Sequence, residues 1–337
     1  MMSDLILEVS DLVVDIPVSS GMLHPVQSIS FEVKRGETLC IVGESGCGKS
    51  LTSLAVMDLL PKTAKRTAST LRLAGEDLQT AGERRMTDIR GNKMAMIFQE
   101  PMTSLNPAYT IGNQLAEALL RHKSVSAAEA RERAIYLLEK VGITAAASRL
   151  SQYPHQLSGG LRQRVMIAMA LMCGPEMIIA DEPTTALDVT IQAQILHLLA
   201  DLQREFNMGM ILITHDLGVV ARVADRVAVM YAGQIVETGT AKQVFENPTH
   251  PYTQGLLECI PIPGKTERGA HLGSIPGIVP SLVGDLPGCH FAERCTHAMD
   301  TCRTGRIDLQ DSFEDGHVFR CVLTPEQSAA NLKKGAA

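Results

Sequence analysis

Residues 43–50, GESGCGKS, form the stretch that most constrains how this chain can fold. They fit the pattern G-x-x-x-x-G-K-[ST] and lie between the apolar runs TLCIV and LTSLAVMDLL, the second of which stops at Pro61. Glycines let a backbone curl until successive amide groups point at phosphate oxygens, and a helix that begins directly after the loop adds a favourable dipole. The stretch therefore predicts a strand, a phosphate-binding loop and a helix, in that order, within an α/β fold.

The last two residues of this loop supply a positive charge and a hydroxyl group. We expect Lys49 to place a positive charge against the β- and γ-phosphates, and the Ser50 hydroxyl to ligate Mg²⁺. The alternative is a glycine turn before a helix with a solvated lysine, which explains the register of strand, loop and helix less well. The residues expected to hold the nucleotide are Gly43, Glu44, Ser45, Gly46, Cys47, Gly48, Lys49 and Ser50.

Acidic residues follow a second apolar run, MIIA, at 177–180. A strand there would deliver Asp181 to the carboxyl edge of a parallel sheet, where Mg²⁺ would sit. Glu182 is then placed to accept a proton from an attacking water. An acidic pair after a strand is usually a solvated strand end, but the phosphate loop favours the functional interpretation. His215 follows a third run, MILIT, and its position alone leaves open a phosphate contact or a satisfied polar residue.

Composition and charge restrict the class of protein. The chain has 337 residues, of which 45% are hydrophobic and 20% charged, and this excludes a disordered chain. Its formal net charge of -6 gives no basic field, so we do not expect nucleic acid as a partner. Acidic residues near the N-terminus disfavour an export signal, and the longest apolar run, 165–173, is too short to cross a membrane. We therefore expect a cytosolic protein, or one peripheral to a membrane.

Periodicity gives a coarse organisation. Short β-like runs occupy 1–60, helical periodicity dominates 111–140, and a helix is expected at about 190–206. Residues 226–239 are typical of a hairpin that turns at Ala232-Gly233. Proline and glycine become frequent after about 240, so we expect two domains, 1–240 and 241–337.

The stretch LSGGLRQR at 157–164 opens a second helix with a serine and two glycines, and in isolation a plain capped helix would explain it. Together with GESGCGKS, IIADEPTTALD and ILITHD, however, it resembles the ATP-binding subunits of ABC transporters over residues 5–240. The resemblance implies a P-loop (RecA-like) nucleotide-binding domain with an antiparallel β subdomain and a helical subdomain near 100–170.

The same resemblance implies roles for single residues, because in that family each ATP lies between two subunits. Residues 43–50 would cradle one ATP, while the signature residues would close over the ATP of the partner. Glu182 would be the catalytic base, and Asp181, Ser50 and Gln99 would hold Mg²⁺. The other implied residues are the signature residues Ser158, Gly159, Gly160 and Gln163, the switch histidine His215 and the D-loop residue Asp188. The family usually stacks an aromatic residue on adenine, but none precedes Phe31, which leaves Ile16, Leu23 or His24 to cover the base.

The C-terminal part narrows the resemblance. The stretches NPTHPYTQGLL, SIPGIVP and GCHFAERCTHAMDTC, together with Cys321, resemble the C-terminal extension of the peptide-importer ATPases, the group for dipeptides, oligopeptides and nickel. Four cysteines there have the spacing C-x5-C-x6-C-x18-C, which lacks the close pairs of structural zinc sites, and spacing alone leaves iron–sulfur, zinc and free thiols open. The resemblance implies a [4Fe–4S] cluster bound by Cys289, Cys295, Cys302 and Cys321, with zinc as the alternative. We expect the remaining cysteines to be buried or loop thiols, with Cys47 exposing the ATPase to thiol reagents.

These inferences predict an ATPase that energises import of short peptides from the cytoplasmic face of the cell membrane. The resemblance implies two transmembrane permease subunits, a second, paralogous ATPase subunit and an extracytoplasmic substrate-binding protein as partners. Nickel, glutathione or opine-like compounds are alternative substrates of the same type of ATPase. A soluble ABC ATPase of translation or DNA repair is disfavoured by the single nucleotide domain and the negative charge.

Overall fold

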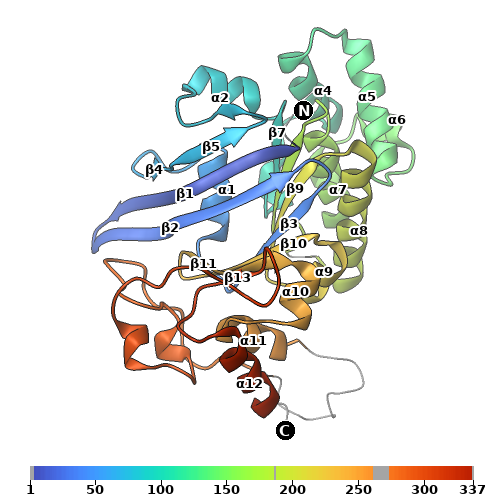
Figure 1. Cartoon of the computed structure of the whole chain (residues 1–337). Helices are drawn as coiled ribbons and strands as arrows, with labels where there is room; N and C mark the ends of the chain where they lie inside the picture. Colours follow the sequence, from blue (N-terminus) through green and yellow to red (C-terminus); the bar gives the residue numbers. More distant parts are fainter. Residues whose placement is uncertain (1–3, 186, 261–272, 336–337) are drawn as a thin grey trace. The chain divides into compact units, whose positions relative to one another are not determined.

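Figure 1 shows the computed structural model, which describes residues 4–185, 187–260 and 273–335. The chain forms two compact units. Unit 1 consists of Met1–Glu8, Glu32–Thr38 and Arg72–Ile213, and unit 2 of Val9–Phe31, Leu39–Leu71 and Thr214–Ala337. Neither unit corresponds to one continuous stretch of sequence.

Three parallel strands form the centre of unit 1, in the order β9-β8-β7. They are β7 (Met94–Ile97), β8 (Met177–Asp181) and β9 (Gly209–Thr214). Every residue of β8 and β9 is buried, as is typical of parallel strands covered on both faces. The two strands predicted at 177–180 and 210–214 are thereby confirmed.

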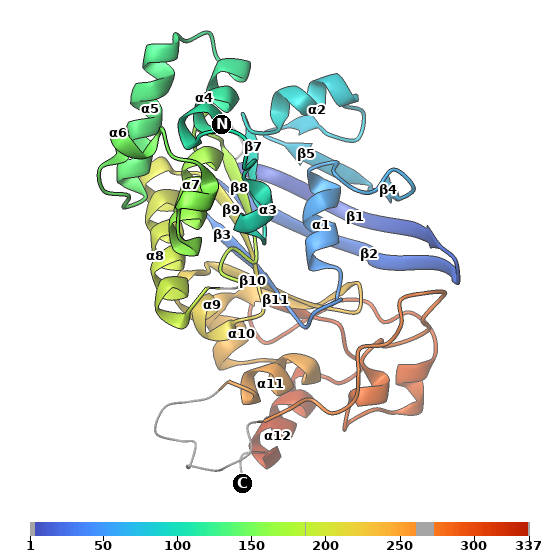
Figure 2. The same cartoon turned by 180° about the vertical axis from the view of Figure 1, so that it is seen from behind.

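Helices make up most of the rest of unit 1. Figure 2 shows α4 to α7 grouped together, and α7 also contacts α8. The helix predicted at about 190–206 is α8 (Val189–Phe206), and the helical region predicted at 111–140 contains α4 and α5. Serine starts α5 for a local reason, because the Ser126 hydroxyl accepts from Glu129 N–H while the Glu129 carboxylate accepts from Ser126 N–H. The other elements of unit 1 are β6 (Glu76–Asp77), α2 (Glu83–Ile89), α3 (Pro101–Ser104), α4 (Ile111–His122), α5 (Ala127–Lys140), α6 (Ala146–Arg149), η1 (Pro154–Gln156) and α7 (Gly159–Ala170).

Unit 2 contains a mixed sheet in the order β12-β13-β11-β10-β3. β3 (Thr38–Val42) is parallel to β10 (Arg226–Tyr231), and β10 forms an antiparallel hairpin with β11 (Gln234–Thr240). The hairpin turns at Ala232 and Gly233, as predicted, and both residues have positive φ, which suits the right-handed twist of the strands. In unit 2, β4 pairs with β1 in antiparallel register, Val13 opposite Thr67.

The helices and the other strands of unit 2 come before, between and after the strands of this sheet in the sequence. α1 (Lys49–Val56) follows the phosphate loop, as predicted, but ends well before Pro61. The remaining elements with residues in unit 2 are β1 (Leu5–Val18), β2 (Gly21–Lys34), β4 (Lys65–Thr67), β5 (Thr70–Leu73), α9 (Leu217–Val223), α10 (Ala241–Glu246), α11 (Pro251–Glu258), η2 (Ala292–Arg294), η3 (Asp300–Arg303), β12 (Gln310–Asp311), β13 (Val318–Phe319) and α12 (Pro325–Gly335).

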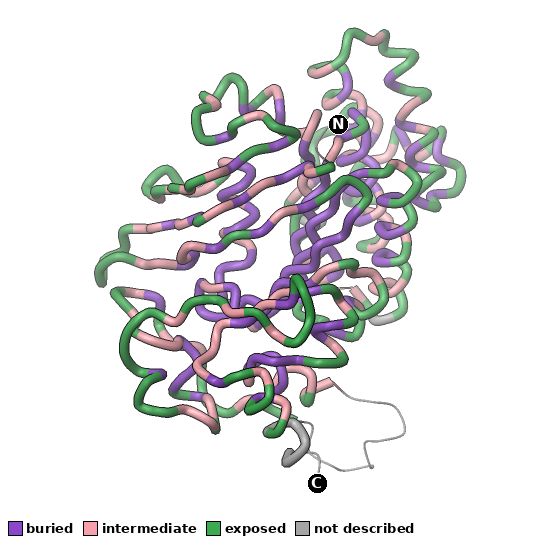
Figure 3. The backbone as a smooth tube through the Cα atoms, viewed as in Figure 1, coloured by how far each residue is buried: buried purple, intermediate pink, exposed green. Residues whose placement is uncertain are grey.

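Polar contacts hold the C-terminal segment of unit 2, which comprises the described residues 241–260 and 273–335. Its buried residues occur in short, interrupted stretches (Figure 3), whereas the buried residues of β3 and β10 are consecutive. The carboxylate of Glu237, on β11, is 0% exposed and accepts from Thr249 N–H at 2.7 Å, His250 N–H at 2.8 Å and His317 Nε2 at 2.7 Å. This charged acceptor with three donors joins β11 to the residues that follow it, in addition to buried apolar side chains such as Tyr252 and Phe319. Within the part of the chain that the structure describes, no helix is both long and apolar enough to span a bilayer.

Candidate nucleotide-binding and hydrolysis site

The phosphate loop of unit 2 has the backbone that its glycines predict. Gly43, Gly46 and Gly48 all have positive φ. A Cβ on Gly43 would lie 2.1 Å from the carbonyl oxygen of Met230, and one on Gly48 would lie 1.9 Å from that of Pro25. Glycine is therefore required at 43 and 48 for two reasons, the backbone conformation and the close approach of neighbouring strands.

Lys49 is folded back over this loop. Its ammonium group donates to the carbonyl oxygens of Gly43 at 2.8 Å and Glu44 at 2.9 Å, and the residue is only 5% exposed. The loop leads directly into α1, which begins at Lys49, so the amide groups of the first turn face the same region. A buried cation beside the backbone amides of a helix N-terminus is an arrangement that binds phosphate.

A carboxylate pair ends β8 in unit 1, as the sequence predicts. Asp181 is 6% exposed, and Glu182 follows it with the unusual φ of 43°. A left-handed backbone costs a non-glycine residue of order 1–3 kcal/mol, and such outliers cluster at functional sites. The amide of Glu182 donates to the carbonyl of Ile213 at 3.0 Å, which fixes this turn.

The side chain of Glu182 is oriented by two donors. Gln99 Nε2 donates to Glu182 Oε2 at 3.1 Å, and Thr185 Oγ1 donates to the same oxygen at 2.9 Å. The structure thus brings together two of the predicted catalytic residues, Gln99 and Glu182, within unit 1. Thr185 was not singled out from the sequence, although it lies in the same IIADEPTTALD stretch.

The signature stretch begins helix α7. Ser158 is its N-cap, with a hydroxyl that accepts from Leu161 N–H at 3.4 Å, and Ser158 and Gly159 are exposed. A Cβ on Gly160 would lie 3.3 Å from Ile191 in α8, so small residues here permit close packing. Asp188 caps α8 by accepting from Ile191 N–H at 3.0 Å. The serine, the glycines and Asp188 therefore lie on neighbouring helix N-termini of unit 1.

Gln163 differs from the other signature residues. It is 0% exposed, and neither its amide nitrogen nor its amide oxygen has a hydrogen-bond partner in the described residues. The side chain faces the interior of unit 1, so this structure offers it no surface toward a partner's nucleotide. The role of Ser158, Gly159, Gly160 and Gln163 toward a partner's nucleotide stays a prediction, and among these four residues Gln163 is the one that is fully buried.

His215 follows β9 and is exposed. It belongs to unit 2, as does the phosphate loop, whereas the carboxylates and the signature belong to unit 1. The next residue, Asp216, caps α9 by accepting from Gly218 N–H at 2.9 Å. The predicted site residues are thus divided between the two units, and their roles toward ATP stay predictions.

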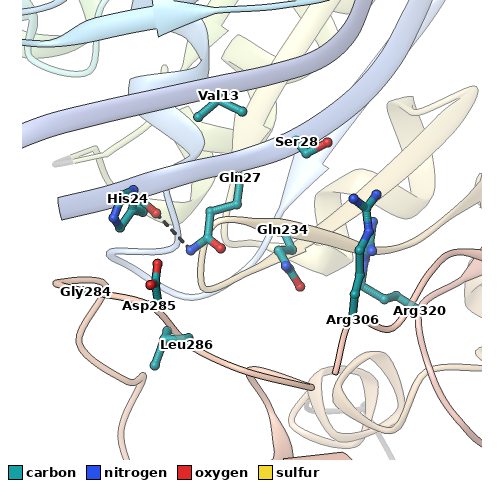
Figure 4. A pocket seen from close by; sticks show the side chains of 10 residues that line it. All are labelled: Val13, His24, Gln27, Ser28, Gln234, Gly284, Asp285, Leu286, Arg306 and Arg320. Carbon is teal, nitrogen blue, oxygen red and sulfur yellow. Dashed lines mark hydrogen bonds between the residues drawn. The ribbon is translucent and has the colours of Figure 1, made fainter. Parts of the chain in front are cut away.

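His24, one candidate for covering adenine, is engaged elsewhere. Its Nδ1 lies 2.6 Å from Asp15 Oδ1, and its amide donates to Leu282 in the C-terminal part of unit 2. His24 also lines a polar pocket of about 300 Å³ in unit 2 (Figure 4). Figure 4 shows Arg306 and Arg320 on the opposite side of this pocket from His24. Which residue covers adenine stays open among Ile16, Leu23 and His24.

The four tail cysteines, Cys289, Cys295, Cys302 and Cys321, line one small apolar cavity of unit 2. Burial raises the pKa of Cys289 to about 12 and that of Cys321 to about 11, so both thiols are protonated at neutral pH in this environment. In the described part of the chain, no group of three or more histidine, cysteine or acidic side chains is arranged to hold a metal ion. The structure therefore does not confirm the predicted metal centre.

The surroundings of these sulfurs nevertheless resemble those of thiolate ligands. His297 N–H donates to Cys295 Sγ and Met299 N–H donates to Cys302 Sγ, both at 3.4 Å. Backbone amides of Phe291 and Leu323 lower the pKa of Cys289 and Cys321 against the larger effect of burial. Hydrogen bonds of this kind stabilise charged sulfur, so these donors would suit sulfur ligands of a metal centre.

The other cysteines lie away from this group in the sequence. Cys40, Cys47 and Cys173 are buried, as predicted, and Cys259 is partly exposed. Burial raises the pKa of Cys47, which opposes the expectation that this thiol exposes the ATPase to thiol reagents.

Sequence reasoning missed a set of contacts on the phosphate loop. Arg294 forms an ion pair with Glu44, and the hydroxyl of Tyr252 accepts from the amide of Glu44 at 2.9 Å. The only signal in the sequence was Glu44, a charged residue at a position of the phosphate-loop motif that accepts any side chain.

Comparison with known proteins decides the family. An ABC transporter model matches residues 26–185, and a model of the oligopeptide/dipeptide transporter C-terminal region matches residues 236–302. The dipeptide transport ATP-binding protein DppD of Bacillus subtilis is 49% identical over 98% of both chains, and DppD of Escherichia coli is 49% identical over 94% of this chain and 96% of that one. This chain belongs to the ABC transporter ATP-binding proteins.

Solved structures agree with this membership. A dimeric ATP-binding cassette, MJ0796, bound to ADP and Pi is 26% identical, with a TM-score of 0.63, and the match covers 70% of this chain and 98% of that one. The chain is therefore an ATPase with the mixed α/β and helical ABC fold, and its substrates are ATP with Mg²⁺. The relatives named above place it in the dipeptide and oligopeptide group of the family.

Proposed function

We propose that this chain hydrolyses ATP to energise the import of di- and oligopeptides through a membrane ABC transporter. The observation that carries the proposal is the combination, in one chain, of the ABC transporter match with the oligopeptide/dipeptide C-terminal match. Relatives that are 49% and 51% identical over 98% and 90% of this chain are named as dipeptide and oligopeptide transport ATP-binding proteins.

The site residues divide into a binding group and a hydrolytic group. In unit 2, residues 43–50 would cradle the phosphates of ATP, with Lys49 against the β- and γ-phosphates and His215 at the γ-phosphate. Ser50, Gln99 and Asp181 would hold Mg²⁺, which neutralises phosphate charge when bound. In unit 1, Ser158, Gly159 and Gly160 would close over the ATP of a partner subunit, with Asp188 beside that interface.

Glu182 would act as the base in hydrolysis. Water attacks the γ-phosphorus, the bond to the β,γ-bridging oxygen breaks, and the water proton passes to the Glu182 carboxylate, giving ADP and inorganic phosphate. The two donors on Glu182 Oε2, Gln99 and Thr185, fix the orientation of the carboxylate before the reaction. Hydrolysis removes the phosphate that joins two subunits and thereby allows them to separate.

We further propose the partners and the location. The ATPase would lie peripherally on the cytoplasmic face of the cell membrane, bound to two permease subunits. A second, paralogous ATPase would complete a heterodimer, and an extracytoplasmic binding protein would deliver the peptide.

The test is a pull-down of Glu182→Gln with Mg-ATP from gently solubilised membranes of the native host, with Lys49→Ala as the matched control that should not bind ATP. Two multi-span permeases and a sister ATPase, enriched with Glu182→Gln over Lys49→Ala, would support the proposal. The recovered binding protein is then titrated with dipeptides, longer peptides and Ni²⁺. Ribosomes or DNA-repair factors in place of permeases, or a binding protein that takes no peptide, would contradict it.

For the tail cysteines we propose a [4Fe–4S] cluster, with zinc as the alternative. Support comes from four sulfurs around one cavity and from the backbone donors to them. Iron, sulfide and zinc analysis of anaerobically purified protein tests this, together with its visible absorption spectrum. Cys302→Ser should lose the metal and Cys259→Ser should retain it; a wild-type protein without iron, sulfide or zinc would overturn the assignment.

A further inference from the structure

Glu44 is the second residue of the phosphate loop, at a position where the motif requires no particular side chain. A carboxylate at this position is electrostatically unfavourable, because ATP brings several negative charges onto the same loop. In unit 2 this carboxylate has a partner: Arg294 Nη1 donates to Oε2 at 2.5 Å and Nη2 donates to Oε1 at 3.0 Å. A cation from the C-terminal segment thus neutralises the only acidic side chain of the loop.

Arg294 is itself held in place. Its side chain is only 4% exposed, against 31% for Glu44. Arg294 Nε donates to the carbonyl of Pro276 at 2.9 Å, and Nη2 also donates to that of Ile275 at 3.1 Å. Its guanidinium carbon lies 5.7 Å from the ring centroid of Tyr231. A guanidinium fixed on several sides cannot follow Glu44 to a new position, so the pair determines where Glu44 lies.

Other groups of unit 2 hold the same loop. The Glu44 amide donates to the Tyr252 hydroxyl at 2.9 Å, and the amide of Gly233 donates to the Cys47 carbonyl at 3.1 Å. Tyr252 packs against Phe291, with ring centroids 5.3 Å apart. Tyr252 and Phe291 both belong to the C-terminal segment, which therefore contacts the loop through a hydrogen bond and an ion pair, while ring packing within the segment holds Tyr252.

We propose that Arg294 is a positioning residue for ATP binding: it neutralises and fixes Glu44, so that the phosphate loop is set for ATP by the C-terminal segment. This role of Arg294 rests on the proposed function, because it requires that residues 43–50 bind the phosphates of ATP. Arg294 lies directly before Cys295, so the segment that carries the tail cysteines also carries the group that holds the loop.

The proposal predicts a change in ATP affinity. Without the guanidinium, Glu44 repels the triphosphate and the loop is free to adopt other arrangements. If the binding arrangement is then present in about a tenth of the molecules, the Kd for Mg-ATP rises about tenfold, since apparent affinity scales with the competent fraction. Turnover at saturating ATP should change much less, because the pair does not belong to the hydrolytic group.

The experiment measures the Kd of Mg-ATP for the full chain by calorimetric titration, and KM and kcat by phosphate release. Arg294→Gln should raise Kd and KM about tenfold, and Arg294→Lys, which keeps the charge but loses the two-pronged contact, should give a smaller rise. Removing the carboxylate as well, in the double variant with Glu44→Gln, should recover most of the lost affinity. A structural role alone would not predict that rescue.

Two further comparisons sharpen the test. The effect of Arg294→Gln should shrink at about 1 M salt, where charges are screened beyond about 3 Å. The matched control is Arg303→Gln, since Arg303 pairs with Glu293 in the same segment, is 49% exposed and lies outside the loop contacts. Its Kd should stay at the wild-type value.

The outcomes separate this proposal from the proposed function. A Kd within twofold of wild type for a folded Arg294→Gln variant, or a double variant as weak as Arg294→Gln alone, overturns the positioning role. If Arg294→Gln does not fold, Arg294→Lys and the double variant carry the same test. Lys49→Ala reports on the loop itself: unchanged ATP binding in that variant would refute the assignment of residues 43–50, whatever Arg294 does.

Discussion

Replacing Glu237 by glutamine tests how unit 2 holds its C-terminal segment. The carboxylate is 0% exposed and accepts three hydrogen bonds, from the amides of Thr249 and His250 and from His317 Nε2. Glutamine has nearly the same size but only one acceptor oxygen, so its amide group must face at least one of these donors. Each hydrogen bond to a charged group contributes about 1.5–3 kcal/mol, and a buried donor left without a partner costs about 1–3 kcal/mol.

Together these values predict that Glu237→Gln lowers the free energy of unfolding by about 3–5 kcal/mol, the range seen when one partner of a buried ionic contact is removed. Equilibrium urea unfolding gives this quantity. It can be followed by far-ultraviolet circular dichroism and by tyrosine fluorescence, which is informative because the chain has five tyrosines and no tryptophan. Tyr231 and Tyr252 both report from unit 2.

The control is Glu293→Gln, since that carboxylate is 78% exposed in its ion pair with Arg303. Its unfolding free energy should stay within about 0.5 kcal/mol of wild type. A loss below about 1 kcal/mol for Glu237→Gln, no larger than typical for any substitution, would refute the argument that this carboxylate holds the segment.

Three further substitutions follow from the site and from the buried histidine. Glu182→Gln should leave the Kd of Mg-ATP within about twofold and lower turnover by at least about 100-fold in a phosphate-release assay; hydrolysis at the wild-type rate would rule out the base. Lys49→Ala should weaken Mg-ATP binding about tenfold or more in a calorimetric titration, and unchanged affinity would contradict the phosphate contact. Burial lowers the pKa of His250 from about 6.5 to about 3, so the unfolded chain binds a proton that the folded one does not, and stability is full above pH 6.5 and falls as the pH drops toward 3. His250→Asn keeps an acceptor for Tyr252 N–H and should make the free energy of unfolding depend less on pH between pH 7 and 5. An equally steep fall of that free energy in the wild-type protein and the variant would contradict this.

Features with local causes could be predicted from the sequence. The phosphate loop followed from its glycines, since the close approach at Gly43 and Gly48 leaves room for no other residue. The strand before Asp181 followed from a short apolar run, and the hairpin at Ala232-Gly233 from its turn residues.

Features with distant causes could not be predicted. The apolar run after the loop suggested a helix up to Pro61, but α1 ends at Val56. The backbone at Asp58 has a φ of 54°, and Arg66 donates to the carbonyl of Ala55 at the end of the helix. That arginine lies beyond the proline, where the periodicity of the apolar run gives no information about it.

Two site details were hidden for similar reasons. Gln163 was grouped with the signature by its place in the sequence, but its position along α7 turns it into the interior. The Glu44–Arg294 pair joins residues 250 positions apart, so no local pattern contains it. The family resemblance supplied the roles of the site residues, whereas these contacts depend on how this particular chain packs.

The pairing of β11 with β13 has a consequence for the synthesis of the chain. β11 (Gln234–Thr240) adjoins β10, which in turn pairs with the strand that leads into the phosphate loop. Its outer neighbour β13 (Val318–Phe319) and the partner His317 are synthesised after all of β3, β10 and β11. Unit 2 therefore cannot complete its sheet until residues 317–319 have been synthesised, long after its phosphate loop. A chain shortened before residue 317 would carry the phosphate loop but leave β11 without its outer neighbour, and an unpaired strand edge of this kind is a template for aggregation.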